Sequence, residues 1–573
     1  MKRLLLPALS LFVSTCIAQF TSTLNLNTVV SDAPVIEEAV PIAAGSGGNT
    51  MVTYFKQNVG GNPYDFYLQT LDENGNYVIG SNGAAVSTYP QSTAIYKYDM
   101  KADNEGNIVA AFQDERTGTL DVVAYRVTPN GNSVWGVAGV ACIDPAAAGG
   151  IGPGVGVLTN GDAIVAWQAD GSPKDWVSIQ RITSLGVPVY STPVRIIDST
   201  NLASYSRPQV VPMQNGDFMV LYVRQTGNFF PYTNTMFMRR YDIGGQPVWA
   251  QPVQVSTNTI TFFDYPSVIP DGNNGAYVAF ASGNPLNTAL IDTWVQHIDQ
   301  NGNLWSATGT AAVSGVASQR MSPKIRFEGS MPHPVVLIKE TDPGQSYSAV
   351  KIQAFDTNTG AALWTPSGVS VTTLGNDYDE PFDLRDICGN MMIAFTRTNA
   401  TGVDLYATKV DYNGAAMWPS PLSVLSNATG NKFRVQLTPS YSSQGISQVV
   451  AVWEDERNGR GVYAQNIACD GSTGPLYTTG VGSMVKPIAS VSVYPNPGSD
   501  SRLELYSENQ QVVAASLYDA VGRCVATRER VQLVNGVNTF ELSTLFGNEV
   551  PKGVYTIRLL GAGSAGQVRW VRW

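Results

Sequence analysis

The chain contains two histidines, His297 and His333. A hydrolase needs a placed base, a nucleophile or a pair of acids, and histidine is the most common base beside a serine or a cysteine. His297 lies in an alternating segment, at the place where other segments carry Arg126 or Arg181. His333 lies in a proline-rich turn, and neither histidine has a serine or cysteine signature beside it. We interpret both histidines as structural residues, and no catalytic set is evident.

The triplet Asp-Glu-Arg occurs at residues 114–116 and again at 455–457, each time between an apolar segment and a glycine-containing turn. Glycoside hydrolases use a pair of carboxylates as their catalytic groups. Because the triplets hold equivalent places in a repeat, we instead predict turns stabilised by an aspartate cap and a local Asp–Arg pair. A sialidase would need Asp-box repeats and an arginine triad, and the sequence has no such boxes.

Three acidic segments superficially resemble calcium loops, namely DENGN (72–76), DQNGN (299–303) and DYNGA (411–415). A calcium loop of the EF type continues to a distant glutamate, which does not follow here. These segments therefore predict hairpin turns, and neither a metal nor a cofactor is indicated. The cysteines Cys142, Cys388, Cys469 and Cys524 match no zinc or redox spacing, and isolated cysteines are usually small core residues. A Cys388–Cys469 bridge between neighbouring repeats remains open in an oxidising compartment.

The candidates for ligand contact are the aromatic residues of the segment 225–234, where Phe229, Phe230 and Tyr232 occur. We expect this segment to be the longest connection between the second and third strands of a repeat. Exposed aromatic rings would suit stacking on a sugar ring or contact with a protein. The alternative is a loop that folds these rings onto its own repeat.

The elements that must carry these residues repeat along the chain. A short apolar segment ends eight times in a large side chain, with successive ends 55 to 58 residues apart, at Phe55, Phe112, Trp167, Tyr222, Phe280, Ile338, Phe395 and Trp453. A tight turn with glycine follows each, and after it comes one of Ile79, Trp135, Tyr190, Trp249, Trp305, Trp364, Trp418 and Tyr477. Asn-Gly between alternating segments is a strong hairpin signal.

Four antiparallel strands in each repeat are typical of a β-propeller. The sequence predicts an all-β chain with an eight-bladed propeller over residues 19–485. We expect the second strand of each blade to be buried between blades, and the fourth strand to carry the aromatic residue. Residues 23–31 resemble a fourth strand, so we expect them to complete the last blade and close the ring. An outer-membrane barrel and two four-bladed propellers are the alternatives.

The N-terminus combines Lys2 and Arg3 with an apolar run over residues 4–17, and a small residue, Ala18, follows. This pattern predicts a signal peptide over residues 1–18, cleaved between Ala18 and Gln19. The run is too short for a membrane anchor, and no later stretch indicates a transmembrane segment. Acylation of Cys16 in a lipoprotein is the weaker alternative, because the preceding residues fit a lipobox poorly.

After the repeats the period stops, and the tail contains a set of turn and strand motifs formed by Tyr494, Pro495, Asn496, Pro497, Asp519, Gly522, Arg523, Gly553, Tyr555 and Arg558. In order and spacing this tail resembles the C-terminal sorting domain of the type IX secretion system of Bacteroidota. It departs from that family in ending Arg-Trp-Val-Arg-Trp. Read alone, the tail predicts a small Ig-like β-sandwich over residues 486–573. The resemblance implies export across the outer membrane, with the secretion machinery and a surface sortase as partners.

The formal net charge of −10 argues against nucleic acid as a partner, because phosphate binding needs a basic footprint. An acidic chain is also poorly suited to anionic lipid. We therefore expect a secreted or surface-attached protein that binds or adheres to a glycan or a protein. The alternatives are a secreted hydrolase of glycans or peptides, and a structural component of a surface assembly.

Overall fold

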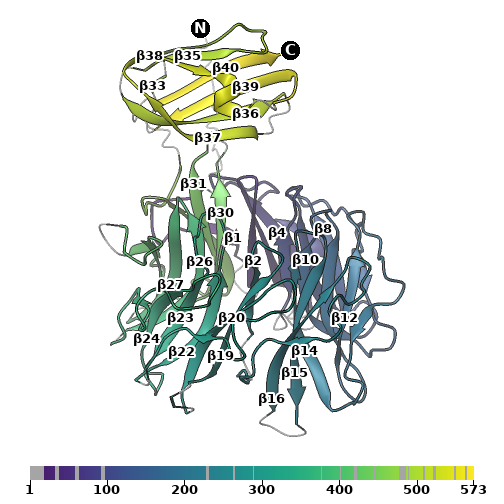
Figure 1. Ribbon diagram of the computed structural model, residues 1–573. Helices are drawn as coiled ribbons and strands as arrows, with labels where there is room; N and C mark the ends of the chain where they lie inside the picture. Colours follow the sequence, from purple (N-terminus) through teal and green to yellow (C-terminus); the bar gives the residue numbers. More distant parts are fainter. Residues whose placement is uncertain are drawn as a thin grey trace, which may run out of the picture. The chain divides into compact units, whose positions relative to one another are not determined.

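The computed structural model describes residues 19–32, 38–58, 63–91, 97–227, 232–261, 265–284, 286–287, 289–315, 317–375, 377–400, 402–418, 422–442, 445–476, 486–487, 489–507, 510–520, 524–547, 550–561 and 564–573. The chain divides into two compact units, Met1–Leu476 and Tyr477–Trp573 (Figure 1). Within the described ranges, no helix has both the length and the apolar character needed to cross a membrane.

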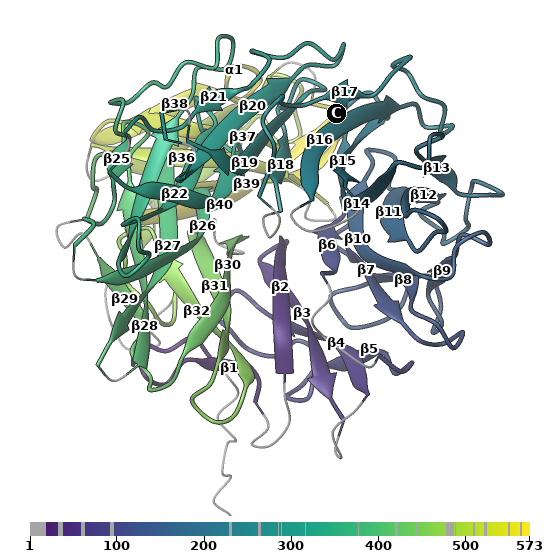
Figure 2. The same cartoon turned by 90° about the horizontal axis from the view of Figure 1, so that it is seen from below.

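The N-terminal unit is built from four-stranded antiparallel sheets (Figure 2). The described residues form six separate four-stranded sheets and one larger sheet, in which two four-stranded groups meet at a single bridge between Ser348 and Tyr378. The innermost strands are β2 (Glu38–Ser46), β6 (Asp99–Ala102), β10 (Gly150–Val157), β14 (Ala203–Pro212), β18 (Ser267–Pro270), β22 (Gln319–Arg326), β26 (Tyr378–Ile387) and β30 (Lys432–Tyr441). Each innermost strand contacts the innermost strand of the next sheet, and β30 contacts β2. This closed radial arrangement is that of a β-propeller.

The second strand of each sheet contains the recurring apolar segment. These strands are β3 (Asn49–Gln57), β7 (Ile108–Asp114), β11 (Ala163–Ala169), β15 (Phe218–Thr226), β19 (Ala276–Gly283), β23 (Val335–Thr341), β27 (Asn390–Asn399) and β31 (Ser447–Asp455). On β7, Ile108 and Phe112 pack toward the preceding sheet, whereas Val109 and Ala111 pack toward the following one. The expected burial of this strand between neighbouring sheets is confirmed, since both of its faces meet apolar side chains.

The third and fourth strands complete each sheet toward the outside. The third strands are β4 (Tyr64–Leu71), β8 (Asp121–Val127), β12 (Trp176–Ile182), β16 (Thr233–Tyr241), β20 (Ile291–Ile298), β24 (Ser348–Ala354), β28 (Gly402–Val410) and β32 (Gly461–Ala468). The outermost strands are β5 (Ala84–Ser87), β9 (Val140–Cys142), β13 (Val194–Ile196), β17 (Val253–Gln254), β21 (Thr310–Ala311), β25 (Val369–Ser370), β29 (Ser423–Ser426) and β1 (Thr28–Ser31).

The recurring aromatic residue does not lie on the outermost strand, which corrects our expectation. Trp135 and Trp249 lie in the connections that precede β9 and β17. Each indole Nε1 donates to a backbone carbonyl in a turn of the next sheet, Trp135 to Ser184 at 3.0 Å and Trp249 to Gln300 at 3.1 Å. The aromatic residue therefore links its sheet to the next one. It can reach the turn of that sheet because it lies in the connection before the outermost strand and not within the strand.

The glycine of each receiving turn leaves room for the ring. At Gly360 a Cβ atom would lie 2.4 Å from the ring of Trp305, and the backbone φ is +70°. The indole Nε1 of Trp305 also donates to Thr357 O at 3.2 Å. Glycine is required there both by the positive φ and by the close approach of the ring.

The ring is closed by the N-terminal segment, as the sequence predicts. Strand β1 pairs antiparallel with β32, so the last sheet has the order β1-β32-β31-β30. Val30 is fully buried in this sheet. Phe20 is buried as well, and its ring lies against Gly75. Tyr477, which we expected as the aromatic residue of the last repeat, lies outside the described residues.

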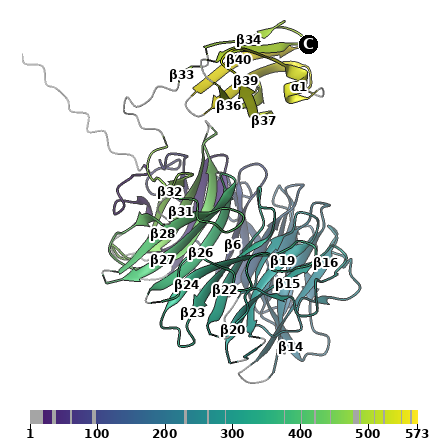
Figure 3. The ribbon, with the colours of Figure 1, turned by 60° about the vertical axis from the view of Figure 1, so that its left-hand side comes forward.

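The described residues of the C-terminal unit form two sheets and a short helix (Figure 3). One sheet has the order β33-β40-β39-β36-β37 and the other β34-β35-β38. The elements are β33 (Lys486–Pro487), β34 (Ala489–Tyr494), β35 (Arg502–Ser507), β36 (Gln511–Asp519), β37 (Cys524–Leu533), β38 (Gly536–Glu541), α1 (Leu542–Phe546), β39 (Gly553–Gly561) and β40 (Ser564–Arg572). Both sheets contribute to one apolar core that includes Leu503, Leu517, Ile557 and Trp570.

Candidate functional site

A cavity of the N-terminal unit lies among the innermost strands, which surround the axis of the ring. Its volume is about 650 Å³, and residues of all the innermost strands or their direct extensions line it. A volume of this size falls within the range of about 300–1,000 Å³ that is typical of small-molecule sites. We call it the axial cavity, and sequence reasoning missed it because its lining residues are dispersed over the whole ring.

Charged side chains project into the axial cavity between apolar ones. The apolar walls include Ile42, Val157 and Phe327, which are all half-buried. The charged lining consists of Lys97, Lys101, Arg326, Arg385, Asp99 and Glu328. An apolar cavity with a few polar groups that fix orientation is the usual form of a ligand site.

Lys97 reaches across the ring. Its Nζ lies 4.7 Å from the ring centroid of Tyr265, although Lys97 directly precedes β6 and Tyr265 precedes β18, in a sheet that is not adjacent. The guanidinium carbon of Arg207 lies 5.2 Å from the same ring. Burial lowers the pKa of Lys97 to about 8, an effect that Asp99 partly opposes. Because burial and neighbouring cations disfavour the charged form of this lysine, an anion beside its amino group would stabilise that charge.

The two carboxylates of the axial cavity both have basic partners. Asp99 Oδ1 lies 2.5 Å from Lys101 Nζ, and Asp99 also accepts a hydrogen bond from Val155 N. Glu328 Oε1 lies 3.0 Å from Arg385 Nε. These carboxylates come from β6 and from the residues after β22, in sheets that are separated by three others in the ring.

A second cavity, of about 510 Å³, lies between the last two sheets beside Phe382 and Phe433. Two of its arginines pair with the same glutamate. Arg434 Nη1 lies 2.6 Å from Glu454 Oε2, and Arg460 Nε lies 3.2 Å from Glu454 Oε1. We take the axial cavity as the candidate site because it is larger and every innermost strand contributes to it.

The segment 225–234 is not a long loop. Strand β15 continues through Thr226 and β16 begins at Thr233, so only residues 227–232 connect them. The expected long loop is therefore replaced by an extended hairpin, because its flanking residues pair with each other. Tyr232 is half-buried, whereas Phe229 and Phe230 lie outside the described residues.

The acidic triplets form the predicted turns. Arg116 Nη2 lies 2.6 Å from Asp114 Oδ2, and Arg457 Nη2 lies 2.6 Å from Asp455 Oδ2. Asp455 is fully buried and also accepts a hydrogen bond from Trp453 Nε1 at 2.8 Å. Since both aspartates are occupied by local arginines, the triplets stabilise turns.

His297 takes part in a repeating pair between the third strand and a turn. Its Nε2 lies 2.8 Å from Asp271 Oδ2. Arg126 pairs in the same way with Asp103, at 2.5 Å. His333 lies in the connection between β22 and β23, in a different sheet from His297. The structure therefore places His297 in the same role as the arginine of other repeats.

The three acidic segments that resemble calcium loops form hairpin turns. In the first, Asp72 Oδ1 accepts hydrogen bonds from the backbone N–H groups of Asn74 and Asn76, each at 2.8 Å. Asp299 and Asp411 accept equivalent bonds in the other two turns. The aspartate oxygens thus hold the backbone of their own turns.

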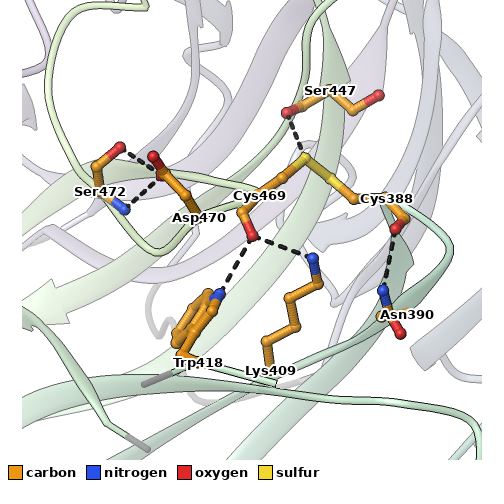
Figure 4. The surroundings of a disulfide bond; sticks show 8 residues. All are labelled: Cys388, Asn390, Lys409, Trp418, Ser447, Cys469, Asp470 and Ser472. Carbon is orange, nitrogen blue, oxygen red and sulfur yellow. Dashed lines mark hydrogen bonds between the residues drawn. A yellow bond between two sulfur atoms is a disulfide. The ribbon is translucent and has the colours of Figure 1, made fainter. Parts of the chain in front are cut away.

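Cys388 and Cys469 form a disulfide bond, which answers the question that the sequence left open (Figure 4). Cys388 follows β26 and Cys469 follows β32, so the bond joins the last two sheets. The carbonyl of Cys469 also accepts hydrogen bonds from Trp418 Nε1 at 3.1 Å and Lys409 Nζ at 3.0 Å. The last two sheets are therefore joined at this point both by a covalent bond and by hydrogen bonds. Cys142 is a buried thiol, and Cys524 is an exposed one.

The residues of the tail motifs stabilise strand ends in the C-terminal unit. Tyr494 ends β34 and is exposed, whereas Asn496 Oδ1 accepts a hydrogen bond from Val571 N at 2.9 Å. Pro495 O accepts one from Ser501 Oγ at 2.6 Å. The Asn496 contact ties the segment that contains Pro497 to the last strand.

The remaining described residues of the tail motifs lie on β36 and β39. Asp519 pairs with Tyr555 across these strands, and Tyr555 is buried against Trp570. Gly553 begins β39, and Arg558 lies on the same strand. Gly522, Arg523 and Ala18 lie outside the described residues, while Gln19 is exposed.

No family model and no curated protein matches the chain. It is similar to the solved α-L-arabinofuranosidase of Fusarium graminearum, with 14 % identity over 59 % of this chain and 96 % of that one, at a TM-score of 0.34. An α-L-arabinanase of Penicillium chrysogenum gives 12 % identity over 59 % and 98 %, at 0.34. A polysaccharide lyase gives 9 % identity over 74 % and 90 %, at 0.36.

All three proteins have the names of enzymes, whereas we expect a binding protein, with a hydrolase as an alternative. Likenesses with TM-scores this low carry no argument about the activity of this chain. The choice between the two functions therefore depends on the residues of the site.

Proposed function

We propose that the N-terminal unit is an eight-bladed propeller that binds a ligand in its axial cavity. The observation that carries this proposal is the cavity of about 650 Å³ to which every innermost strand contributes. Loops and strand ends around a propeller axis form a natural binding face. According to this proposal, the protein is secreted or attached to the cell surface and functions by binding a ligand.

The binding proposal is tested with the chain from Gln19 to Trp573 on a glycan and matrix-protein array. Its matched variant is Ala102→Trp, because Ala102 is exposed, ends β6 and lines the cavity. We expect binding by the unchanged chain and its loss in the variant, with circular dichroism showing that both fold. Equal binding by the variant would contradict a site in the axial cavity.

The chain is also proposed to be exported in two steps. Residues 1–18 would direct it across the inner membrane and be cleaved after Ala18. Residues 486–573, as an Ig-like sorting domain, would engage the type IX machinery and a sortase at the outer membrane. The disulfide between Cys388 and Cys469 supports an oxidising destination.

The export proposal is tested by deleting residues 486–573 in the native host. We expect the truncated protein to accumulate in the periplasm, as measured by fractionation and immunoblotting. Delivery of this truncation to the surface at the normal level would contradict the sorting assignment.

Hydrolysis of a glycan is the second candidate, and one observation favours it. Asp99 and Glu328 place two carboxylates from distant sheets in the same cavity. A general acid and a general base or nucleophile is the pair that glycoside hydrolysis requires. Turnover on a polysaccharide panel that is lost in both Asp99→Asn and Glu328→Gln would establish the activity. Turnover that survives both changes would exclude these carboxylates.

A further inference from the structure

The axial cavity has the opposite charge balance to the chain as a whole. The chain has 35 basic and 45 acidic side chains. The cavity lining has four basic side chains, Lys97, Lys101, Arg326 and Arg385, against the two acidic ones, Asp99 and Glu328. Basic groups are thus concentrated on the ring axis of an otherwise acidic protein.

The acidic groups neutralise only part of this charge. Asp99 pairs with Lys101, and Glu328 pairs with Arg385. Arg326 pairs with Asp383, which is buried behind the lining, at 2.6 Å.

Asp383 is itself surrounded by basic groups. Although burial would raise the pKa of Asp383, the neighbouring charges of Arg326, Arg385 and Lys324 lower it. One carboxylate therefore serves several cations, which leaves an excess of positive charge around the cavity.

Lys97 is the cation best placed to meet a ligand. Among the residues that the structure describes, it forms no ion pair, and its amino group lies over the ring of Tyr265. Lys324 and Arg207 lie close enough to lower its pKa further. Several positive charges that converge on one cavity are most stable when an anion lies between them.

The shape and the walls of the cavity indicate the class of anion. Half-buried apolar side chains such as Ile42, Val157 and Ile269 line the cavity between the charged groups. Inorganic phosphate would occupy a small part of about 650 Å³ and would leave these walls without contacts. A saccharide presents apolar C–H faces to such walls and acidic substituents to the cations.

We infer that the axial cavity binds an anionic saccharide, one that carries carboxylate or sulfate groups. This inference rests on the proposed binding function and names its ligand class. The carboxylate or sulfate would lie within hydrogen-bond reach of Lys97 and Arg385. The sugar rings would pack against the apolar residues between them.

The test is isothermal titration calorimetry of the chain from Gln19 to Trp573 at about neutral pH. The probes are trigalacturonate, its fully methyl-esterified form as a neutral match, a sulfated cello-oligosaccharide and inorganic phosphate. We expect the acidic saccharides to bind and the methyl ester to bind at least about tenfold more weakly. Comparison of the affinities for trigalacturonate and for the sulfated oligosaccharide then shows which acidic group the cavity prefers.

Variants connect the binding to the cavity. Lys97→Met and Arg385→Gln should each lower the affinity for the acidic probe by about tenfold or more, because a charge-assisted hydrogen bond is lost. The matched control is Lys174→Met, in the turn between β11 and β12 and outside the cavity lining. Lys101→Met, at a side chain that is 48 % exposed, provides a variant with little risk to folding.

Three other results would contradict the inference, and each shows which part of it is wrong. If the methyl ester binds as tightly as the acid and Ala102→Trp abolishes both, the cavity binds a neutral ligand and only the charge inference fails. If phosphate binds as tightly as the saccharides, the saccharide class is wrong. If no acidic probe binds while array ligands do, the anionic class is wrong and the binding function remains.

Discussion

Asp455 shows how one residue can resemble a catalytic acid in sequence and act as a structural one. Its carboxylate lies between Arg457 and the indole of Trp453, and it is fully buried. The occurrence of the triplet at equivalent places in two repeats indicated this role, because a catalytic group is not expected to recur at equivalent places of a repeat. The local partner Arg457 was predicted from the triplet, whereas Lys432 lies on β30 and could not be predicted because it is distant in the sequence.

Replacement of Asp455 with alanine should destabilise the protein strongly. The change leaves the partly buried Arg457 and the buried Lys432 without their carboxylate, and loss of one member of a buried pair costs about 3–5 kcal/mol. The control is Asp377→Ala, whose side chain is 52 % exposed and pairs with Arg397, and whose loss should cost below about 1 kcal/mol. Urea denaturation measures both. Similar midpoints for the two variants would refute the structural role of Asp455.

Lys97 makes a prediction about pH. Because its pKa is lowered to about 8, the amino group is mainly protonated below that pH and loses its charge above it. The charged and titratable groups around it are Asp99 and Lys101 on β6, Arg207 on β14, Tyr265 before β18 and Lys324 on β22. Affinity for an acidic saccharide should therefore fall as the pH rises through about 8.

Calorimetric titrations between pH 7 and pH 9 measure this dependence. In Lys97→Met the affinity should be lower and nearly constant over the same range. An unchanged pH profile in this variant would show that another group is responsible.

At the scale of the elements, the sequence was most informative about the second strand of each repeat. These strands are apolar on both faces, and the structure buries them between sheets, as on β7. The outermost strands were predicted less well, because they are as short as Val253–Gln254 and leave little pattern. The aromatic residues, such as Trp249, were assigned to those strands although they contact the next sheet.

The turn glycines provide a test of that contact. Gly360→Ala should be destabilising by about 1–2 kcal/mol for the positive φ and about 1–3 kcal/mol more for crowding against Trp305. The control is Gly272→Ala, which has a φ of +76° and no atom within 4 Å of the added Cβ, and which should lose the backbone part alone. Equal losses in thermal denaturation would show that the ring of Trp305 does not constrain the turn.

At the scale of the whole molecule, closure of the ring depends on segments from both ends of the N-terminal unit. The resemblance of residues 23–31 to an outermost strand predicted this closure. Such a strand has no neighbours of its own at the N-terminus, so it must pair with the exposed edge of another sheet. The axial cavity could not be predicted in the same way. Its residues, from Ile42 to Thr438, are brought together only when the ring closes.

The disulfide should stabilise the junction of the last two sheets. Its half-cystines are 81 residues apart, and a bond that closes a loop of that length contributes about 2–4 kcal/mol by restricting the unfolded chain. The double variant Cys388→Ser/Cys469→Ser should lose this amount in guanidinium denaturation, as should the reduced protein. Cys142→Ser alone serves as the control for loss of a thiol. A double variant as stable as the unchanged chain would show that the bond adds nothing to the fold.

The account as a whole rests on the axial cavity as the ligand site of the ring. The most direct measurement is a crystal structure of the chain from Gln19 to Trp573 with trigalacturonate. We predict density for the saccharide in the axial cavity, with a carboxylate within hydrogen-bond reach of Lys97 or Arg385. Density for the saccharide at another place on the ring, with the axial cavity empty of it, would contradict the account.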